Sequence, residues 1–466
     1  MLTTVLVVVL FSLLAWEFLK RDLWKKLGLK EAPGVPIFGN LLPVILRRKP
    51  FFQVHMDAYN YFPDVPYVGF YNFTQPILII RDASLIETML KDHAKNFEDH
   101  GLFADPSDPL SMNLFYLSGN EWKWVRSKLR SSFSTSSLKG IHPGIQECTD
   151  EFIAGIGDTI NLRPAMNEFA CNVIAKTVFS LDDATGFVEA SEKVYDLSGM
   201  GGLKVFLRTF LPRTALALGI KMVPKDLEDF YRKAISNSER RPGSFFDTLY
   251  RLKENEPDFT DDLMLAQFFL FILAGFETTA SALTYTLYLL AKHPEAQTKA
   301  RREVQTVLEK EGVSFDSLKD MVYLDYVINE ALRLYTPVTS ILRVSKENFM
   351  LPCGVVLPKG TCVNIPYLCL HRDPRYYSEP LVFKPERWES PNPVFFPFGI
   401  GPRNCLGMQL ALLELKVFLS SFLSKYTISL NPRTPDPLQF DPTSLFINPK
   451  LPIYLNLKPN SPGEFQ

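Results

Sequence analysis

Apolar positions along the chain follow a helical spacing over most of its length and a strand-like spacing in a few short stretches. Strand patterns occur at 65–82, at 354–366, and in the tail at 426–430 and 453–457. Helical patterns dominate most of the remaining chain, and no internal repeat or low-complexity tract is present. We therefore predict a mainly α fold with small β-sheets, of the α+β class.

The N-terminal residues Met1 to Trp16 carry no charge, and basic residues follow at positions 20, 21, 25 and 26. A secretory signal peptide would have a basic start and a small-residue cleavage site, and this segment has neither. The pattern predicts a signal-anchor helix with a basic flank over 1–31. By the positive-inside rule, a single domain over 32–466 then faces the cytosol. A buried N-terminal helix is the alternative.

The longest helical pattern starts at Thr260 and stops near His293-Pro294, which corresponds to a helix about 50 Å long. Residues 263–276 are apolar almost all round, so we expect this helix to be buried. It contains the run Ala274-Gly275-Phe276-Glu277-Thr278-Thr279. Polar groups in a buried helix are costly unless they are used or paired. A glycine can also serve close packing and a threonine can bond back to its own helix, so the run alone leaves both interpretations open.

A second segment, 203–222, mixes apolar residues with Lys204, Arg208, Arg213 and Lys221. This mixture fits a surface that enters the membrane interface. A pair of core helices broken at Pro212 fits the pattern equally well.

Composition excludes some classes of protein. Hydrophobic residues make up 46% and charged residues 22% of the chain, which excludes intrinsic disorder. The net charge of −1 argues against a generally basic nucleic-acid binder. Six cysteines in 466 residues do not form a small-protein disulfide framework, and a cytosolic domain keeps them reduced. The shortest gap, Cys362 to Cys369, is wider than the pairs typical of zinc sites.

One cysteine has a distinctive setting, in the run Phe398-Gly399-Ile400-Gly401-Pro402-Arg403-Asn404-Cys405-Leu406-Gly407. A helical pattern follows directly, so the Arg403 charge and the helix dipole both favour the thiolate of Cys405. Glycines let a large planar cofactor approach the backbone. The run lacks the third glycine of a dinucleotide fingerprint and the Gly-Lys-Ser/Thr of a phosphate loop. It indicates a thiolate beside a planar cofactor.

These residues carry a resemblance. Phe398, Gly401, Arg403, Cys405 and Gly407 match F-x-x-G-x-R-x-C-x-G, and the chain resembles the cytochromes P-450, which are haem-thiolate enzymes. The other marks that resemble the family are Glu330-Ala331-Leu332-Arg333, Pro385-Glu386-Arg387-Trp388, Trp122-x-x-x-Arg126 and the run 274–279. The resemblance implies the P-450 fold, with the haem between a long distal helix and the proximal cysteine loop, and makes 32–466 a catalytic haem domain.

The resemblance also implies site residues. Haem b would be the cofactor, with Cys405 as the axial ligand whose thiolate favours O–O cleavage. Donors to the two haem propionates would come from Trp122, Arg126, Arg343 and Arg403, and the cofactor loop would be shaped by Phe398, Gly401 and Gly407. A structural triad of Glu330, Arg333 and Arg387 would hold the loop, since the first two stand at i and i+3 on a helix.

On the distal side, the resemblance implies that Gly275 leaves a groove for O₂ and that Glu277 and Thr278 relay protons. No nicotinamide or flavin site is visible, so electrons would come from a partner. The family implies NADPH–cytochrome P-450 reductase, with cytochrome b5 as an optional second donor and no nucleic-acid partner. The candidates for a basic docking face, or equally for solvated surface charges, are Lys123, Lys128, Arg130 and Arg403.

Within the family, the chain is most similar to animal microsomal members of the insect family-six and family-nine groups. The run DPLSMNLFYLSGNEWKWVRSKL and the run LHRDPRYYSEP carry this similarity. It implies an endoplasmic reticulum monooxygenase for apolar small molecules: xenobiotics, hormones or lipids. Candidate pocket residues, each with core packing as the alternative, are Phe103, Phe115, Phe268, Phe269 and Ile341.

The chain departs from these relatives by being short. Arg387 and Cys405 are only 18 positions apart, and the stretch 180–260 is also trimmed. The short segment between Arg387 and Cys405 brings haem retention into question, and the trimmed stretch 180–260 brings the width of the substrate entrance into question. Two other functions stay open: a haem-thiolate isomerase or dehydratase that needs no reductase, and an inactive haem- or lipid-binding relative.

Overall fold

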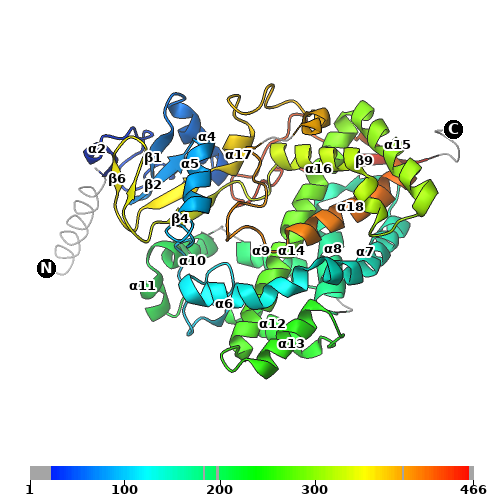
Figure 1. Ribbon diagram of the computed structural model, residues 1–466, viewed down its shortest axis with the longest axis horizontal. Coiled ribbons are helices and arrows are strands. Elements are labelled where there is room, and N and C mark those ends of the chain that lie inside the picture. Colours follow the sequence, from blue (N-terminus) through cyan, green and yellow to red (C-terminus); the bar gives the residue numbers. More distant parts are fainter. Residues whose placement is uncertain (1–22, 182–183, 196–198, 391–392, 461–466) are drawn as a thin grey trace.

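Helices supply most of the regular structure in the computed structural model, which describes residues 23–181, 184–195, 199–390 and 393–460 (Figure 1). Three small sheets accompany them, so the predicted α+β class is confirmed. The predicted anchor lies outside the described residues up to position 22, and α2 (Leu23–Lys26) carries the last part of its basic flank. The division at residue 31 remains a prediction.

The predicted long helix, α14 (Asp261–Lys292), runs through the centre of the fold (Figure 1). The side chain of Thr260 accepts the backbone N–H of Leu263, so the predicted N-cap is present. The neighbours that pack against α14 are α8 (Leu162–Val173), α16 (Val322–Leu334) and α18 (Met408–Lys425).

Within the described part of the chain, α14 is the one helix long and apolar enough to cross a membrane. However, 72% of its most apolar stretch is buried inside the protein. Its apolar surface is therefore already covered by neighbouring helices, as expected for a core helix.

The strands form one larger and two smaller sheets. The first has the order β1-β2-β7-β4 and joins β1 (Tyr67–Asn72), β2 (Gln75–Ile80), β7 (Cys362–Ile365) and β4 (Ile341–Val344). The second has the order β3-β9-β8 and joins β3 (Thr159–Asn161), β9 (Tyr454–Pro459) and β8 (Tyr426–Leu430). The hairpin pairs β5 (Phe349–Met350) with β6 (Val356–Leu357). Strands thus form in each predicted stretch, whereas β3, β4 and β5 lie outside those stretches.

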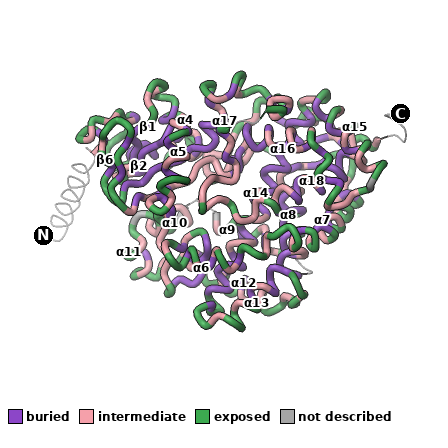
Figure 2. Tube along the Cα trace, viewed as in Figure 1, coloured by how far each residue is buried: buried purple, intermediate pink, exposed green. Residues whose placement is uncertain are grey.

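The buried apolar residues form two clusters, one among the helices around α14 and one around the sheet of β1 and β2 (Figure 2). The remaining helices before α14 are α3 (Leu42–Ile45), α4 (Phe51–Tyr61), α5 (Ala83–Glu87), η2 (Thr88–Asp92), η3 (Pro109–Ser111), α6 (Gly119–Leu129), η4 (Arg130–Phe133), α7 (Thr135–Gly155), η5 (Ile174–Val178), α9 (Phe187–Tyr195), α10 (Gly199–Phe210), α11 (Pro212–Ala217), α12 (Lys225–Asn237) and α13 (Phe245–Asn255). Those after it are α15 (Pro294–Glu311), η6 (Ser317–Asp320), α17 (Tyr367–His371) and η7 (Pro385–Glu389).

The segment 203–222 contains a helix break at the predicted proline, because α11 starts at Pro212. Val205, Leu211 and Leu218 are nonetheless exposed on it. The break at Pro212 fits the prediction of a helix pair, and the exposed apolar side chains fit the prediction of a surface that enters the membrane interface. Both predictions for this segment are therefore retained.

All six cysteines, which lie within the described ranges, are free, as predicted for a reduced domain. Burial raises the pKa of the Cys148 thiol to about 11 and the pKa of Cys171, Cys362 and Cys369 to about 12. These four are therefore thiols at neutral pH.

Candidate functional site

A cavity of about 1530 Å³, its mouth included, opens beside the middle of α14. Its walls come from α14, from α6, from the π-helical turn η5, from the connection between α16 and β4, and from the loop 397–407 before α18. These segments are far apart in the sequence. The fold therefore brings the cysteine loop, the Trp122 helix and the run 274–279 around one space.

The cysteine loop is held by its own backbone hydrogen bonds. The N–H of Cys405 donates to the carbonyl of Phe398 at 2.8 Å, and the N–H of Asn404 donates to that of Gly401 at 3.1 Å. Gly399 and Gly401 have φ of +73° and +77°, which favour glycine. This tight turn directs Phe398 and Cys405 to the cavity wall.

Gly401 has a different reason for being glycine than the one we expected. A Cβ on it would lie 2.0 Å from the carbonyl oxygen of Leu90 in η2, and Gly401 does not line the cavity. The residue therefore lets the loop pack against another backbone segment, and its predicted part in binding the cofactor stays a prediction. Gly407 does line the cavity and caps the start of α18.

The Cys405 side chain is exposed because it opens into the cavity. Burial raises the pKa of its thiol, while the backbone N–H of Gly407 and the charge of Arg126 lower it. Desolvation thus opposes the thiolate in the protein alone, while the N-terminal end of α18 favours it as expected, and the cation that lowers this pKa is Arg126. A bound metal ion would remove the proton outright.

Three arginine side chains lie along one edge of the cavity. Arg343 on β4 and Arg403 on the cysteine loop are both buried, and the Arg403 guanidinium stacks on the Trp122 ring at 4.6 Å. Arg126, one turn beyond Trp122 on α6, donates to the side-chain oxygen of Asn404 at 2.8 Å. The four predicted propionate donors thus line the same cavity.

The positive charge at this edge is only partly compensated: Arg403 lies 3.4 Å from Oδ1 of Asp99 and donates to the backbone carbonyls of Glu98 and Phe115 at 3.1 and 3.0 Å. Burial and the neighbouring Arg343 lower the pKa of Arg403 to about 9, and burial lowers the pKa of Arg343. The buried Nε of Arg403 has no hydrogen-bond partner among the described residues. Buried charge that is only partly compensated is costly, so this edge is suited to an anionic ligand.

His100 belongs to the same edge and was missed by the sequence reasoning. Its Nδ1 lies 2.6 Å from Nη1 of Arg343, and its ring stacks on Phe115 with centroids 4.4 Å apart. Burial and the charges of Arg343 and Arg403 place its pKa well below the usual range. A neutral ring can accept a hydrogen bond from Arg343. A single histidine in a loop offers no periodic signal from which this position could be found.

On α14, the side of the helix that lines the cavity includes Ala274, Gly275 and Thr278. The hydroxyl of Thr278 donates to the carbonyl of Ala274 at 2.8 Å, which is the back-bonding that the sequence left open. A Cβ on Gly275 would lie 2.8 Å from Cδ1 of Ile174 in η5. Gly275 therefore lets η5 pack closely against α14, although it also borders the cavity.

Glu277 points elsewhere. It is buried and paired with Arg163 of α8, and it does not line the cavity. Glu277 thus faces α8, whereas the adjacent Thr278 faces the cavity. Nη1 of Arg163 is buried and has no hydrogen-bond partner in the described part of the chain, so Arg163 can donate a further hydrogen bond.

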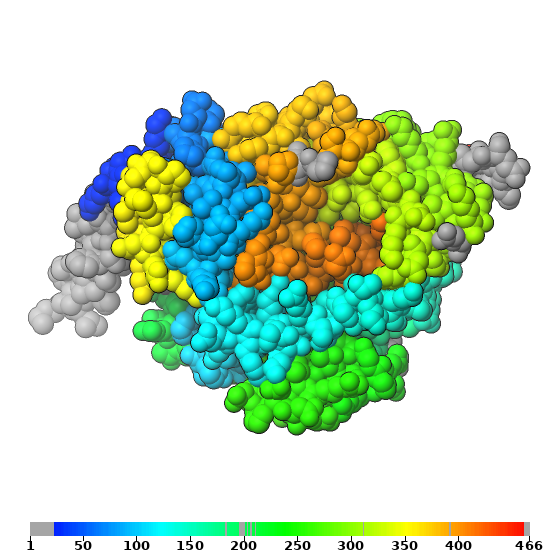
Figure 3. Space-filling view, viewed as in Figure 1, coloured from blue at the N-terminus to red at the C-terminus, as the bar shows by residue number. Residues whose placement is uncertain are grey.

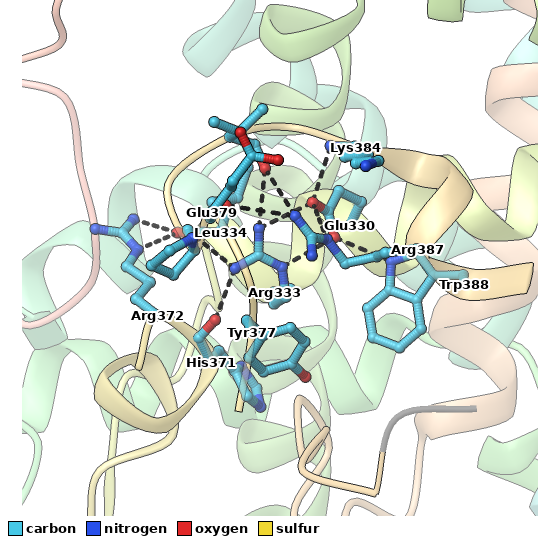
Figure 4. Close-up of polar contacts among 12 residues, drawn as sticks. Glu330, Arg333, Leu334, His371, Arg372, Tyr377, Glu379, Lys384, Arg387 and Trp388 are labelled. Atoms are coloured by element: carbon cyan, nitrogen blue, oxygen red, sulfur yellow. Dashed lines mark hydrogen bonds and ion pairs between the residues drawn. The ribbon is translucent and has the colours of Figure 1, made fainter. Parts of the chain in front are cut away.

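The structural triad assembles as predicted from the motifs (Figure 4). Arg333 donates to both oxygens of Glu330, at 2.9 and 2.8 Å, and Arg387 donates through Nε to Oε1 of Glu330 at 2.8 Å. Trp388 adds its indole N–H to Oε2 of Glu330 at 3.0 Å. Glu330 and Arg333 are fully buried, so each charge depends on the other.

Of the five candidate pocket residues, Phe115 and Ile341 line the cavity. Phe268 and Phe269 do not: they are buried in the helical core, where Phe268 packs on Phe179 with centroids 4.4 Å apart. Phe103 does not line the cavity either. Further apolar lining that the sequence reasoning missed comes from Phe133, Ile174, Val178, Leu270, Phe271 and Val338.

A buried acid, Glu414 of α18, also lines the cavity and was not predicted. It interacts with Thr279 of α14, and its Oε2 has no partner within the described ranges. Burial holds the pKa of this carboxyl well above its usual range, which favours its protonated form.

The candidate docking cations differ in exposure. Lys123 is paired with Glu98 at 3.1 Å and Lys128 with Glu256, while Arg130 is exposed. Arg403 is almost fully covered, so its proposed place on a docking face is wrong. In Figure 3 the orange surface around residues 400–415 adjoins the cyan surface of α6 to α7; Lys123 and Lys128 belong to α6, and Arg130 belongs to η4.

Comparison with known proteins gives a consistent result. The family model described as "Cytochrome P450" matches residues 30–457. Cytochrome P450 6j1 of Blattella germanica is 31% identical over 488 residues, covering 98% of this chain and 97% of the relative. Cytochrome P450 6B1 of Papilio polyxenes is 30% identical, covering 97% and 98%. Cytochrome P450 3A13 of Mus musculus is 32% identical, covering 94% and 92%. The predicted similarity to the insect family-six group is confirmed, and the similarity to family nine stays a prediction.

Proposed function

The chain belongs to the cytochrome P450 family and is a haem-thiolate monooxygenase, and from this premise we propose its detailed activity. It inserts one oxygen atom from O₂ into an apolar small molecule, with electrons from NADPH delivered by a membrane-bound reductase. The observation that carries the proposal is the arrangement of the cavity, where Cys405 stands at one wall and Thr278 of α14 at another.

The residues around the cavity fit haem b, the cofactor of the family. Arg343 and the side chain of Arg403 are buried; Arg403 is paired with Asp99 at 3.4 Å, but its Nε lacks a partner among the described residues. Two propionates would supply the missing negative charge. Cys405 would ligate the iron, while Trp122, Arg126, Arg343, Arg403 and His100 would hold the propionate edge.

When bound, the haem supplies O₂ activation and oxygen transfer, which no amino-acid side chain provides. The chain's own residues supply position and protons. The triad of Glu330, Arg333 and Arg387 anchors the segment that precedes the cysteine loop. The apolar walls exclude water from the reaction space.

Proton supply would pass through α14. Thr278 borders the cavity, and its hydroxyl oxygen can accept one hydrogen bond while it donates another to Ala274. Glu277, adjacent in sequence, is paired with Arg163 on the side of the helix that faces α8. We assign Glu277 to receive protons from that side and Thr278 to hold a proton donor at the cavity.

The substrate would be an apolar molecule because aromatic and aliphatic side chains form the walls away from the cations. The exposed apolar side chains Val205, Leu211 and Leu218 and the apolar N-terminal segment support attachment to the endoplasmic reticulum membrane. Lys123, Lys128 and Arg130 support docking of an acidic reductase surface beside α6.

The test uses the full-length protein in membranes. A reduced-CO difference spectrum should show the red-shifted band of a thiolate-ligated haem in the wild type, and Cys405→Ala should lose it. Addition of NADPH and reductase should then yield a product that carries one added oxygen atom. A wild type without the thiolate band, or an unchanged band in Cys405→Ala, contradicts the assignment. Turnover that needs no reductase would indicate an isomerase or dehydratase.

A further inference from the structure

His371, the last residue of α17, is fully buried and uses both of its ring nitrogens. The backbone N–H of Phe396 donates to Nε2 at 2.9 Å. Nδ1 lies 2.9 Å from the hydroxyl oxygen of Thr336. These two contacts join the segment before the cysteine loop to the residues that follow α16.

The contacts settle the protonation of the ring. Because the Phe396 N–H is a donor only, Nε2 must accept and carries no proton. In a neutral ring Nδ1 then carries the proton and donates to Thr336, whose hydroxyl donates to the carbonyl of Leu332 at 2.5 Å. The ring is therefore held in one tautomer and one orientation by partners at both ends.

The backbone of the same residue joins the structural triad. Nη1 of Arg333 donates to the carbonyl of His371 at 2.7 Å, as Figure 4 shows. Arg333 is fully buried and bound to Glu330 on its other side. His371 thus connects the triad, through its carbonyl, with Phe396, through its ring.

Phe396 is the start of the cysteine loop. The N–H of Gly399 donates to its carbonyl at 3.0 Å, and the N–H of Cys405 donates to the carbonyl of Phe398 at 2.8 Å. A shift at Phe396 would therefore pass through these bonds to Cys405. Phe396 itself is buried, so water cannot replace the His371 ring as the acceptor of its N–H.

The short connection between Arg387 and Cys405 makes this anchor more important. With 18 positions, the segment has little length to absorb a displacement. Other ties near Phe396 include the bond from the Tyr377 hydroxyl to the carbonyl of Val394 at 2.7 Å and the packing of Phe395 on Trp388 and on the His371 ring, with centroids 4.3 and 5.4 Å apart. Among the hydrogen bonds of the described residues, the one to His371 is what ties the backbone N–H of Phe396, whose side chain packs in the buried cluster around the β1–β2 sheet.

We propose that His371 is a positioning residue for Cys405: its ring fixes Phe396 so that the cysteine loop keeps the thiol turned into the cavity. The inference rests on the proposed role of Cys405 as the haem ligand. His371 does not touch the cofactor site, and its effect passes through the backbone of 396–405.

The test compares full-length variants by haem content and by the share of the reduced-CO spectrum in the thiolate band. His371→Leu removes the acceptor, and His371→Gln keeps an amide oxygen that can reach the Phe396 N–H. Tyr377→Phe is the matched control, since it removes a hydrogen bond to Val394 in the same segment. We expect the ratio of non-thiolate to thiolate haem to rise about tenfold in His371→Leu, as for a buried donor left unpaired. His371→Gln and Tyr377→Phe should stay close to the wild type.

The inference is overturned if His371→Leu binds haem with the wild-type share of thiolate band, or if Tyr377→Phe loses as much of that band as His371→Leu. If His371→Leu does not fold, Thr336→Val decides the matter. It removes the acceptor of the Nδ1 proton, so a raised ratio supports the inference and a wild-type ratio overturns it. A wild type that lacks the band, or Cys405→Ala that keeps it, would instead refute the proposed function.

Discussion

Substitution of Gly401 by alanine distinguishes two reasons for a glycine in the cysteine loop: a left-handed backbone, and the close approach of another backbone segment. Gly401 and Gly399 have nearly equal φ, +77° and +73°. A Cβ at Gly401 would lie 2.0 Å from the backbone oxygen of Leu90, which cannot rotate away. A Cβ at Gly399 would lie 3.1 Å from the hydroxyl of Tyr367, a side-chain atom. Gly399→Ala is therefore the matched control for Gly401→Ala.

Both variants carry the cost of a left-handed alanine, about 1–2 kcal/mol. In Gly401→Ala the loop or η2 must also move, by roughly 1 Å, to relieve the clash with Leu90. A displacement of that size beside a reacting centre lowers the rate on the order of a hundredfold. We expect Gly399→Ala to lose stability with its thiolate-ligated haem largely intact, and Gly401→Ala to lose the ligated haem and its turnover as well.

The assay measures thermal unfolding, haem content and the reduced-CO band of both variants at one temperature well below unfolding. A larger loss of the thiolate band in Gly399→Ala than in Gly401→Ala would refute the reasoning, because positive φ or cofactor approach would then outweigh the contact with Leu90. Equal losses would show that the left-handed backbone alone decides both positions.

Three further substitutions test other parts of the structure. His55 is buried and its pKa is lowered to about 4, so the unfolded chain binds one proton more than the folded chain between pH 6.5 and 4. His55 should therefore contribute a loss of about 3 kcal/mol in the free energy of unfolding as the pH falls through this range. His55→Phe should remove this contribution from the pH dependence of stability in acid unfolding curves, and an unchanged pH dependence would contradict it. Arg163→Gln should destabilise the protein by about 3 kcal/mol, because Glu277 is left buried without its partner. Adding Glu277→Gln should restore most of the lost stability, as measured by thermal unfolding, and no recovery in the double variant would refute the pairing of these two residues. Arg343→Met should raise the melting temperature of the haem-free protein, because it removes a buried charge, and should weaken haem retention, because that charge would pair with a propionate in the haem-bound protein. A variant that stabilises both the haem-free and the haem-bound protein, or destabilises both, would contradict this reasoning.

Features that depend on neighbours in the sequence could be predicted. The capped and buried helix α14 followed from Thr260 and the apolar run behind it. The loop around Cys405 followed from its glycines, and the pair of Glu330 and Arg333 followed from their i, i+3 spacing. In each case the residues that interact lie within a few positions of one another, so their spacing carries the information.

Contacts between distant segments could not be predicted, and they changed the meaning of several residues. Gly401 faces Leu90, and Gly275 faces Ile174, although both glycines had been assigned to the cofactor or to O₂. Glu277 turns to Arg163 rather than to the cavity. The sequence offers no measure of which side of a helix or loop meets which neighbour.

By itself, the sequence determined the local elements, the family and the identity of the candidate ligand Cys405, because these depend on short motifs and on periodicity. The tertiary structure alone decided the electrostatics of the site. It gathered Arg343, Arg403 and His100 into one edge where Asp99 compensates only part of the positive charge, and it raised the pKa of the Cys405 thiol by burial. Desolvation and charge pairing act through space, between residues that share no pattern along the chain, and so only the folded arrangement sets them.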